Sequence, residues 1–193
     1  MKPPGQFEWQ ESAAQIGGSS RQAFLAKFDD TLMARKFVDE NWHWAYSQRA
    51  ALFINCPPKI LGEPTGYTSD GQPCYRPLSP PAEIWFLPGV QFEESWGFAK
   101  VKGFVNTVPA SVVEACESFL SDLATRHPIG VEAVGQGWAS FRRFSDGGAF
   151  EFEDMRRAWE LNIAVLGGRQ DTMHLDRRVP RQFVRNGMFH FGL

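Results

Sequence analysis

Apolar residues recur at helical spacing in the first third of the chain, around the segment VDENWHWAY (residues 38–46). Successive residues of a helix turn by about 100°, which places one set of side chains on a single buried stripe: Ala34, Phe37, Val38, Asn41, Ala45 and Leu52. Asp29 and Asp30 both suit a helix N-cap, because a short side-chain oxygen accepts a hydrogen bond from a free backbone amide. The pattern predicts a helix from Asp29 or Asp30 to about residue 53.

Two further segments have the same periodicity. Residues 109–126 space Ser111 and Glu114 as a capping box, and their apolar stripe consists of Val112, Cys116, Phe119, Leu120 and Leu123. This position in the stripe predicts that Cys116 is buried and unreactive. Residues 153–166 stop at Gly167-Gly168, which suits a helix C-terminus, and they align Met155, Trp159, Ile163 and Leu166. Both segments are predicted helices.

Strand patterns lie between the predicted helices. EIWFL (residues 83–87) and WGFAKVKGFV (residues 96–105) are rich in aromatic and β-branched residues and predict two strands joined through Pro88-Gly89. Residues 138–153 predict a hairpin that turns at Asp146-Gly147.

The C-terminal segment RQFVRNGMFHF predicts a second hairpin. It turns at Asn186-Gly187, with Val184 opposite Phe189, because Asn-Gly accepts the positive φ angles that a tight hairpin turn needs.

Together these elements predict an α+β fold: a single compact domain in which an antiparallel sheet carries about three helices on one side, with a C-terminal hairpin. Residues 1–19 are expected to form a flexible N-terminal arm, and residues 20–193 the domain. Residues 55–82 are too rich in proline and glycine for a helix and are expected to form an ordered excursion from it.

Composition narrows the functional classes. The net charge of −2 disfavours a general nucleic-acid or membrane-surface binder. The aromatic share is 14 %, and large rings either fill cores or crowd binding surfaces. The cysteines Cys56, Cys74 and Cys116 are odd in number, and the N-terminal residues contain no apolar secretory signal. Reduced thiols and a cytoplasmic location are therefore expected.

Glu40 and His43 form a Glu-x-x-His pair, the spacing used by helical metal sites. On the predicted helix His43 points directly away from the buried stripe, and the motif occurs once, so a metal site is disfavoured. Trp42 and Trp44 fall at the two borders of the apolar face. A Trp-His-Trp ridge of this kind suits contact with a partner, because tryptophan is enriched at interface hot spots.

Other chemical signals are weaker. Cys56 would need a histidine base such as His127 or His174 to act as a nucleophile, and Cys56-Pro57 alone does not define a haem ligand. His174 and Asp176 match part of a non-haem iron triad with His190 as the third ligand, yet the surrounding jelly-roll strand pattern is missing. Cys56 and Cys74 lack the paired cysteines of a zinc site. No phosphate-binding or hydrolase motif occurs. No cofactor or metal is expected.

Arginine is concentrated near the C-terminus, at Arg177, Arg178, Arg181 and Arg185. Such a cluster suits an acidic protein surface or nucleic-acid phosphates, unless acidic residues of the same chain pair with it.

The sequence therefore predicts a non-catalytic protein-binding domain of the inhibitor, immunity, adaptor or accessory-factor type. The residues expected to contact its macromolecular partner are Trp42, His43, Trp44, Arg177, Arg178 and Arg181. Two alternatives remain: an enzyme with a site assembled from distant residues such as Cys56, His127 or His174, and a nucleic-acid-associated subunit that uses the C-terminal arginines.

Overall fold

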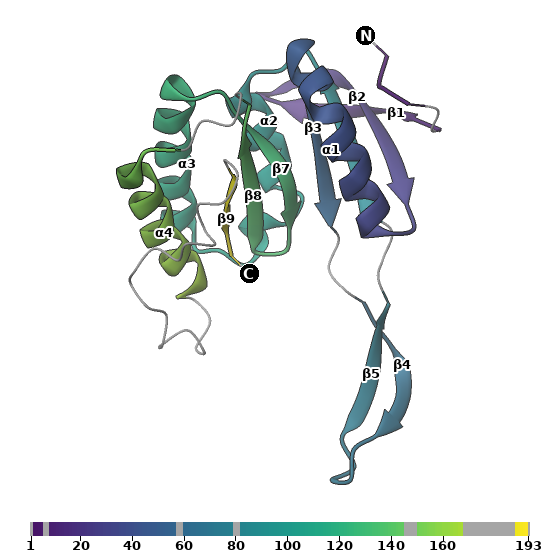
Figure 1. Cartoon of the computed structure of the whole chain (residues 1–193). Helices are drawn as coiled ribbons and strands as arrows, with labels where there is room; N and C mark the ends of the chain where they lie inside the picture. Colours follow the sequence, from purple (N-terminus) through teal and green to yellow (C-terminus); the bar gives the residue numbers. More distant parts are fainter. Residues whose placement is uncertain are drawn as a thin grey trace.

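The computed structural model describes residues 2–5, 8–56, 60–78, 82–144, 150–167 and 188–192. In these ranges the main sheet has seven strands in the order β1-β2-β6-β3-β7-β8-β9, and each neighbouring pair is antiparallel except β3 and β7, which run parallel (Figure 1). Its strands are β1 (Gln10–Ile16), β2 (Ser19–Phe28), β3 (Ala50–Cys56), β6 (Ala82–Pro88), β7 (Ile129–Gly135), β8 (Trp138–Arg143) and β9 (Met188–Phe191). The predicted α+β class with a mainly antiparallel sheet is confirmed.

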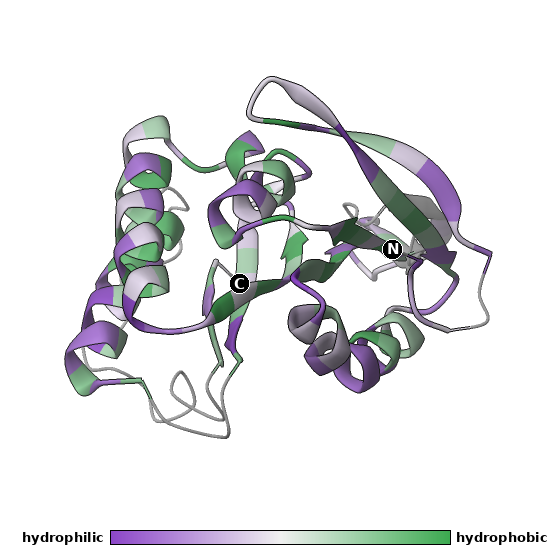
Figure 2. Ribbon diagram, turned by 90° about the horizontal axis from the view of Figure 1, so that it is seen from above, coloured by the Kyte–Doolittle hydropathy of each residue, from purple (hydrophilic) through white to green (hydrophobic). Residues whose placement is uncertain are grey.

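Helices cover both faces of this sheet. They are α1 (Thr31–Ser47), α2 (Phe92–Lys100), α3 (Ala110–Arg126) and α4 (Phe152–Leu166), with a short 3-10 turn, η1 (Phe104–Asn106). Helix α1 packs on one face against β2, β3 and β6, and α2, α3 and α4 pack on the other. Viewed from above, largely hydrophobic strands run between the two helical layers (Figure 2).

The expectation that all helices lie on one side is wrong. Neighbouring residues of a strand point to opposite faces, and β3 buries Leu52 and Ile54 toward α1 while Phe53 packs toward α2. A strand that is apolar on both faces must be covered on both.

Helix α1 begins where the sequence predicts and ends earlier. The Asp30 side chain accepts a hydrogen bond from the amide of Leu32 at 2.8 Å, which confirms an N-cap. The helix stops at Ser47 because Arg49 has a φ of 52°, which is outside the range of a right-handed helix. Residues 50–56, expected in part to continue this helix, form β3.

The predicted strand at 96–105 is also wrong. These residues belong to α2 and η1. Helix α2 buries Trp96, Phe98 and Ala99 on one face, and Glu94 caps its first turn by accepting a hydrogen bond from the amide of Gln91 at 2.9 Å. Tertiary packing of the aromatic rings outweighs their preference for strands here.

The hairpin expected over residues 138–153 is replaced by a different pairing. Strand β8 pairs with β7, which the sequence analysis missed, through a turn at Gln136-Gly137, and its other edge pairs with β9. Phe152 begins α4. The predicted turns at Asp146-Gly147 and Asn186-Gly187, and the pairing of Val184 with Phe189, lie outside the described residues.

The N-terminal and proline-rich segments both contain strands. Residues 10–16, expected to lie in a flexible arm, form the edge strand β1. Residues 60–78 form the two-stranded hairpin of β4 (Ile60–Tyr67) and β5 (Pro73–Leu78), with register shifts on either side of Pro64. Figure 1 shows this hairpin extending away from the main sheet.

Helix α3 matches its predicted extent, but its capping box is absent. Pro109 is the N-cap, and no side chain caps the helix there. The buried stripe consists of Val113, Cys116, Phe119, Leu120 and Leu123. Cys116 has no exposed surface, which confirms its burial.

Candidate functional site

The expected Trp-His-Trp ridge is not a continuous exposed surface. His43 is exposed and Trp44 keeps 38 % of its surface exposed, but Trp42 is only 7 % exposed. The Trp42 ring lies 3.9 Å from the Phe144 ring, and the Arg142 guanidinium lies 4.9 Å from its centre. Trp42 therefore packs between α1 and the end of β8, and His43 and Trp44 are the exposed residues of this segment.

The other predicted site residues are not brought together. Arg177, Arg178, Arg181, His174 and Asp176 lie outside the described residues. Glu40 is exposed and lies 3.9 Å from Lys36, in an ordinary helical ion pair. In the ranges given above, no three His, Cys, Asp or Glu side chains lie close enough to hold a metal ion.

Cys56 and His127 lie at opposite ends of the parallel strand pair. Cys56 is level with Gly135, the last residue of β7, whereas His127 precedes the first, a separation of roughly 25 Å along an extended strand. Burial raises the pKa of the Cys56 thiol, which opposes formation of a thiolate nucleophile. His127 Nε2 instead lies 3.3 Å from Asp154 Oδ2, and Arg126 bonds both oxygens of that carboxylate at 2.8 and 2.9 Å.

A polar cluster near the carboxyl ends of β3 and β7 is largely paired within itself. The Glu83 carboxylate accepts hydrogen bonds from Asn55 at 2.9 Å and from the Trp85 indole at 3.3 Å. The Lys102 ammonium lies 4.1 Å from the centre of the Trp85 ring, and burial lowers its pKa. These contacts show that the polar side chains of this cluster pack against one another.

A cavity of about 630 Å³, with room for a ligand, lies at the other end of the same strands. Pairing between β3 and β7 is confined to Ile54–Cys56 with Ala133–Gly135. Before this contact the strands diverge, and residues 50–52 of β3 and 129–131 of β7 line opposite walls of the cavity. The cavity therefore opens within the sheet, between two strands that are neighbours further along.

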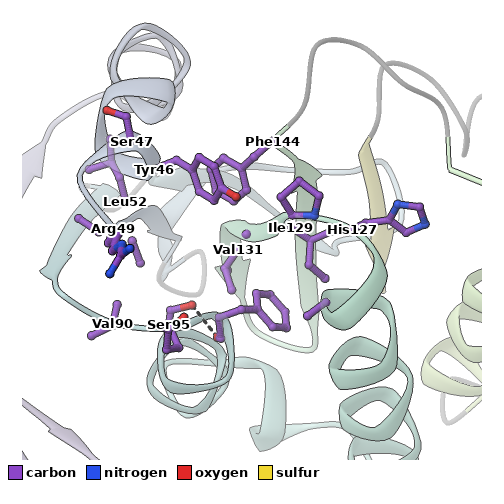
Figure 3. A pocket seen from close by; sticks show the side chains of 17 residues that line it. Tyr46, Ser47, Arg49, Leu52, Val90, Ser95, His127, Ile129, Val131 and Phe144 are labelled. Atoms are coloured by element: carbon purple, nitrogen blue, oxygen red, sulfur yellow. Dashed lines mark hydrogen bonds between the residues drawn. The ribbon is translucent and has the colours of Figure 1, made fainter.

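Aromatic rings cover one side of the cavity. The Tyr46 and Phe144 rings stack 3.9 Å apart with an interplanar angle of 14° (Figure 3). Gly130 permits this arrangement, because a Cβ at that position would lie 2.3 Å from the Phe144 ring. The opposite side is formed by the first turn of α2, including Phe92 and Ser95.

The diverging strands also present backbone groups to the cavity. Residues 50–53 of β3 pair with β6 along their outer edge, and residues 129–131 of β7 pair with β8 along theirs. Alternate residues of a strand direct their N–H and C=O groups to each edge. The edges of β3 and β7 that face the cavity are not paired with each other over these residues of the described chain. Their backbone N–H and C=O groups therefore supply hydrogen-bond donors and acceptors to the cavity.

Polar side chains around the cavity do not form a nucleophile and base pair. The hydroxyls of Ser47 and Ser95 each donate to a carbonyl of their own helix at 2.7 Å. The His127 ring is directed away from the cavity toward α4 (Figure 3). Arg49 is the lining residue with a permanent charge.

Sequence reasoning missed this site because its parts come from separate elements. The lining comes from four separate segments with no shared local motif: the end of α1 with its turn (Tyr46, Arg49), α2 (Phe92), β7 (Gly130) and the end of β8 (Phe144). Tyr46 follows the Trp-His-Trp segment closely, but its pairing with Phe144 depends on how α1 crosses the sheet.

Comparison of the chain with known protein families, with curated proteins and with solved structures finds no match. In the described part of the chain, no helix is long and apolar enough to span a membrane.

Proposed function

We propose that the chain is a non-catalytic protein-binding domain that takes a short extended segment of a partner polypeptide into the cavity between β3 and β7. The observation that carries this proposal is the divergence of two parallel strands around an open volume, since unpaired strand edges recognise extended peptides through main-chain hydrogen bonds.

The size and lining of the cavity support a peptide ligand. A volume of about 630 Å³ is within the usual range of ligand pockets, about 300–1,000 Å³. Apolar side chains such as Leu52, Val90 and Phe92 line it together with the Tyr46–Phe144 pair. Mixed apolar walls with backbone donors and acceptors suit a polypeptide better than a highly charged ligand.

The arrangement of polar groups favours binding over catalysis. Both serine hydroxyls in the lining are engaged by their own helices, and His127 is held by Asp154 outside the cavity. A hydrolytic site would need a nucleophile and a base within hydrogen-bond reach of each other.

Selection of random peptides displayed on phage, with the full chain immobilised, tests the proposal. Enriched peptides should protect backbone amides of residues 50–53 and 129–131 from hydrogen exchange. Failure to enrich any peptide, or protection confined to other strands, would contradict peptide binding in this cavity.

A matched pair of substitutions locates the binding. Ala124 is a half-buried lining residue, so Ala124→Phe fills the cavity and should weaken peptide binding by at least about tenfold, or about 1.4 kcal/mol. Ala164 is exposed on α4, and Ala164→Phe makes the same chemical change away from the cavity. Equal affinities for the two variants would place the peptide elsewhere.

A further inference from the structure

Arg49 lies at the mouth of the cavity in a conformation that arginine rarely adopts. Its φ of 52° is the one positive value found at a non-glycine residue in the described ranges. A side chain in this left-handed region crowds the following carbonyl oxygen, so glycine or asparagine is usual there. The presence of arginine therefore points to a use for its side chain.

Hydrogen bonds hold the Arg49 backbone on both sides. Its amide donates to the carbonyl of Tyr46 at 2.9 Å, and its carbonyl accepts from the amide of Gly89 at 2.9 Å. The first bond connects it to the end of α1 and the second to the residue after β6. The turn thus fixes where the side chain begins, opposite Ile129 across the cavity (Figure 3).

The Arg49 guanidinium makes no ion pair with any residue of the described ranges, whereas Arg21, Arg126, Arg142 and Arg156 each pair with a carboxylate. Among the residues that line the cavity, Arg49 carries the permanent charge, and the other lining side chains are apolar or neutral. A guanidinium is a planar fork of donors that matches a carboxylate with two parallel hydrogen bonds.

We infer that Arg49 receives a carboxylate of the bound polypeptide, either its C-terminal carboxylate or an aspartate or glutamate side chain. This inference rests on the proposed function and adds the chemical class of the ligand. The divergent strands would hold the extended backbone, and Arg49 would fix its direction and position by binding one negatively charged group.

The conformation of Arg49 supplies a test that separates binding from stability. Arg49→Gly removes the guanidinium and relieves the crowding at positive φ, so the variant should melt at a temperature no lower than the parent. It should bind a selected peptide about 10- to 100-fold more weakly, because the charge-assisted hydrogen bonds between guanidinium and carboxylate are lost. Arg49→Lys keeps the charge without the fork and should give an intermediate loss.

The carboxylate itself is tested with peptide variants. A selected peptide is compared with its C-terminal amide and with forms that carry Asp→Asn or Glu→Gln. One of these neutral peptides should bind the parent chain as weakly as the acidic peptide binds the Arg49→Gly variant. The affinity of that neutral peptide should fall little further when the chain carries Arg49→Gly. That variant identifies the source of the carboxylate.

A small probe keeps this inference separate from peptide recognition. N-acetyl-leucine and its neutral amide, N-acetyl-leucinamide, are titrated while the Arg49 side-chain NMR signals are followed. A shift of these signals by the acid alone supports a carboxylate site at Arg49. Failure to enrich any peptide would then contradict the proposed function and leave this carboxylate site standing. Equal shifts by acid and amide, or peptides that bind Arg49→Gly as tightly as the parent, would overturn the inference.

Discussion

Gly103 shows how closely the chain approaches itself at one residue. A Cβ on Gly103 would lie 2.7 Å from the backbone carbon and oxygen of Gly135, and backbone atoms cannot move aside as a side chain can. Gly103→Ala should therefore destabilise the protein by about 1–3 kcal/mol, the usual cost of overpacking. Chemical denaturation with urea measures this change.

Gly97 is the matched control for that substitution. It lies in α2, and a Cβ there meets no atom within 4 Å. Gly97→Ala should stabilise the protein by up to about 1 kcal/mol, because alanine has the higher helix propensity. Similar effects of the two substitutions would show that contact with Gly135 is not what requires glycine at residue 103.

The described cysteines should differ in their reactivity in the folded protein. Cys74 is exposed, Cys56 is half-buried with a pKa raised by burial, and burial raises the pKa of Cys116 to about 12. Because the thiolate is the reacting form, a disulfide reagent at pH 8 should modify Cys74 first and Cys116 only on unfolding. Cys74→Ser should remove the fast phase, and rapid labelling of Cys116 before unfolding would contradict its burial.

At the scale of an element, the start of α1 depends on one side chain. The Asp30 carboxylate accepts the amide hydrogen of Leu32, so Asp30→Ala should cost about 1 kcal/mol of stability. Asp29 is exposed and makes no such bond, and Asp29→Ala should change stability little. Thermal unfolding of both variants distinguishes which aspartate is the cap, a choice the sequence left open.

Helix α1 is tied to β7 and β8 by an ion triad in which Asp39 is exposed and Glu132 is buried. The Arg142 guanidinium bonds Asp39 of α1 at 2.5 Å and Glu132 of β7 at 2.6 Å, and Glu132 is only 5 % exposed. Arg142→Met should destabilise by about 3–5 kcal/mol, since it leaves a buried charge without its partner. Adding Glu132→Gln removes that charge and should recover part of the loss in the same urea titration; no recovery would mean that Arg142 contributes through packing on Trp42 alone.

Sequence periodicity predicted the elements that bury one face. Ala34, Phe37, Val38 and Ala45 of α1 are buried as the helical spacing requires, and the extents of α3 and α4 are nearly right. It failed where an apolar run suits either element: residues 50–53 continue the α1 pattern but form a strand, and Trp96 and Phe98 suggest a strand but lie on a helix. In both places contacts with distant residues decide the conformation.

The cavity could not be predicted in the same way. Its existence depends on where the pairing of β3 with β7 stops, and the sequence gives no signal for that register. The positive φ of Arg49 could not be predicted either. Positive φ is usually predicted from glycine or asparagine in the sequence, and arginine gives no such signal.

At the scale of the whole molecule, the sheet consists of two parts that meet over a short contact. By strand order, β1, β2, β6 and β3 with α1 form one part, and β7, β8 and β9 with α3 and α4 form the other. One apolar core extends across both parts on the face that α2, α3 and α4 cover. The two parts of the sheet are joined by the pairing of Ile54–Cys56 of β3 with Ala133–Gly135 of β7. Helix α2 packs against strands of both parts, namely β1, β3 and β7. The first part is drawn entirely from residues 10–88, so its pairings are closer in sequence than the junction.

This short parallel junction has a consequence for the order of folding. Contacts between residues far apart in sequence carry a larger loop-closure entropy, so they tend to form late. Stopped-flow measurements should show that Val134→Ala, at the junction, mainly accelerates unfolding, whereas Ile84→Val, inside the first part, mainly slows folding. If Val134→Ala instead slowed folding as much as Ile84→Val for the same loss of stability, the junction would already be formed in the transition state. With late closure, β3 would present its unpaired edge during folding before β7 arrives, and intermediates would be exposed to strand-to-strand association between chains.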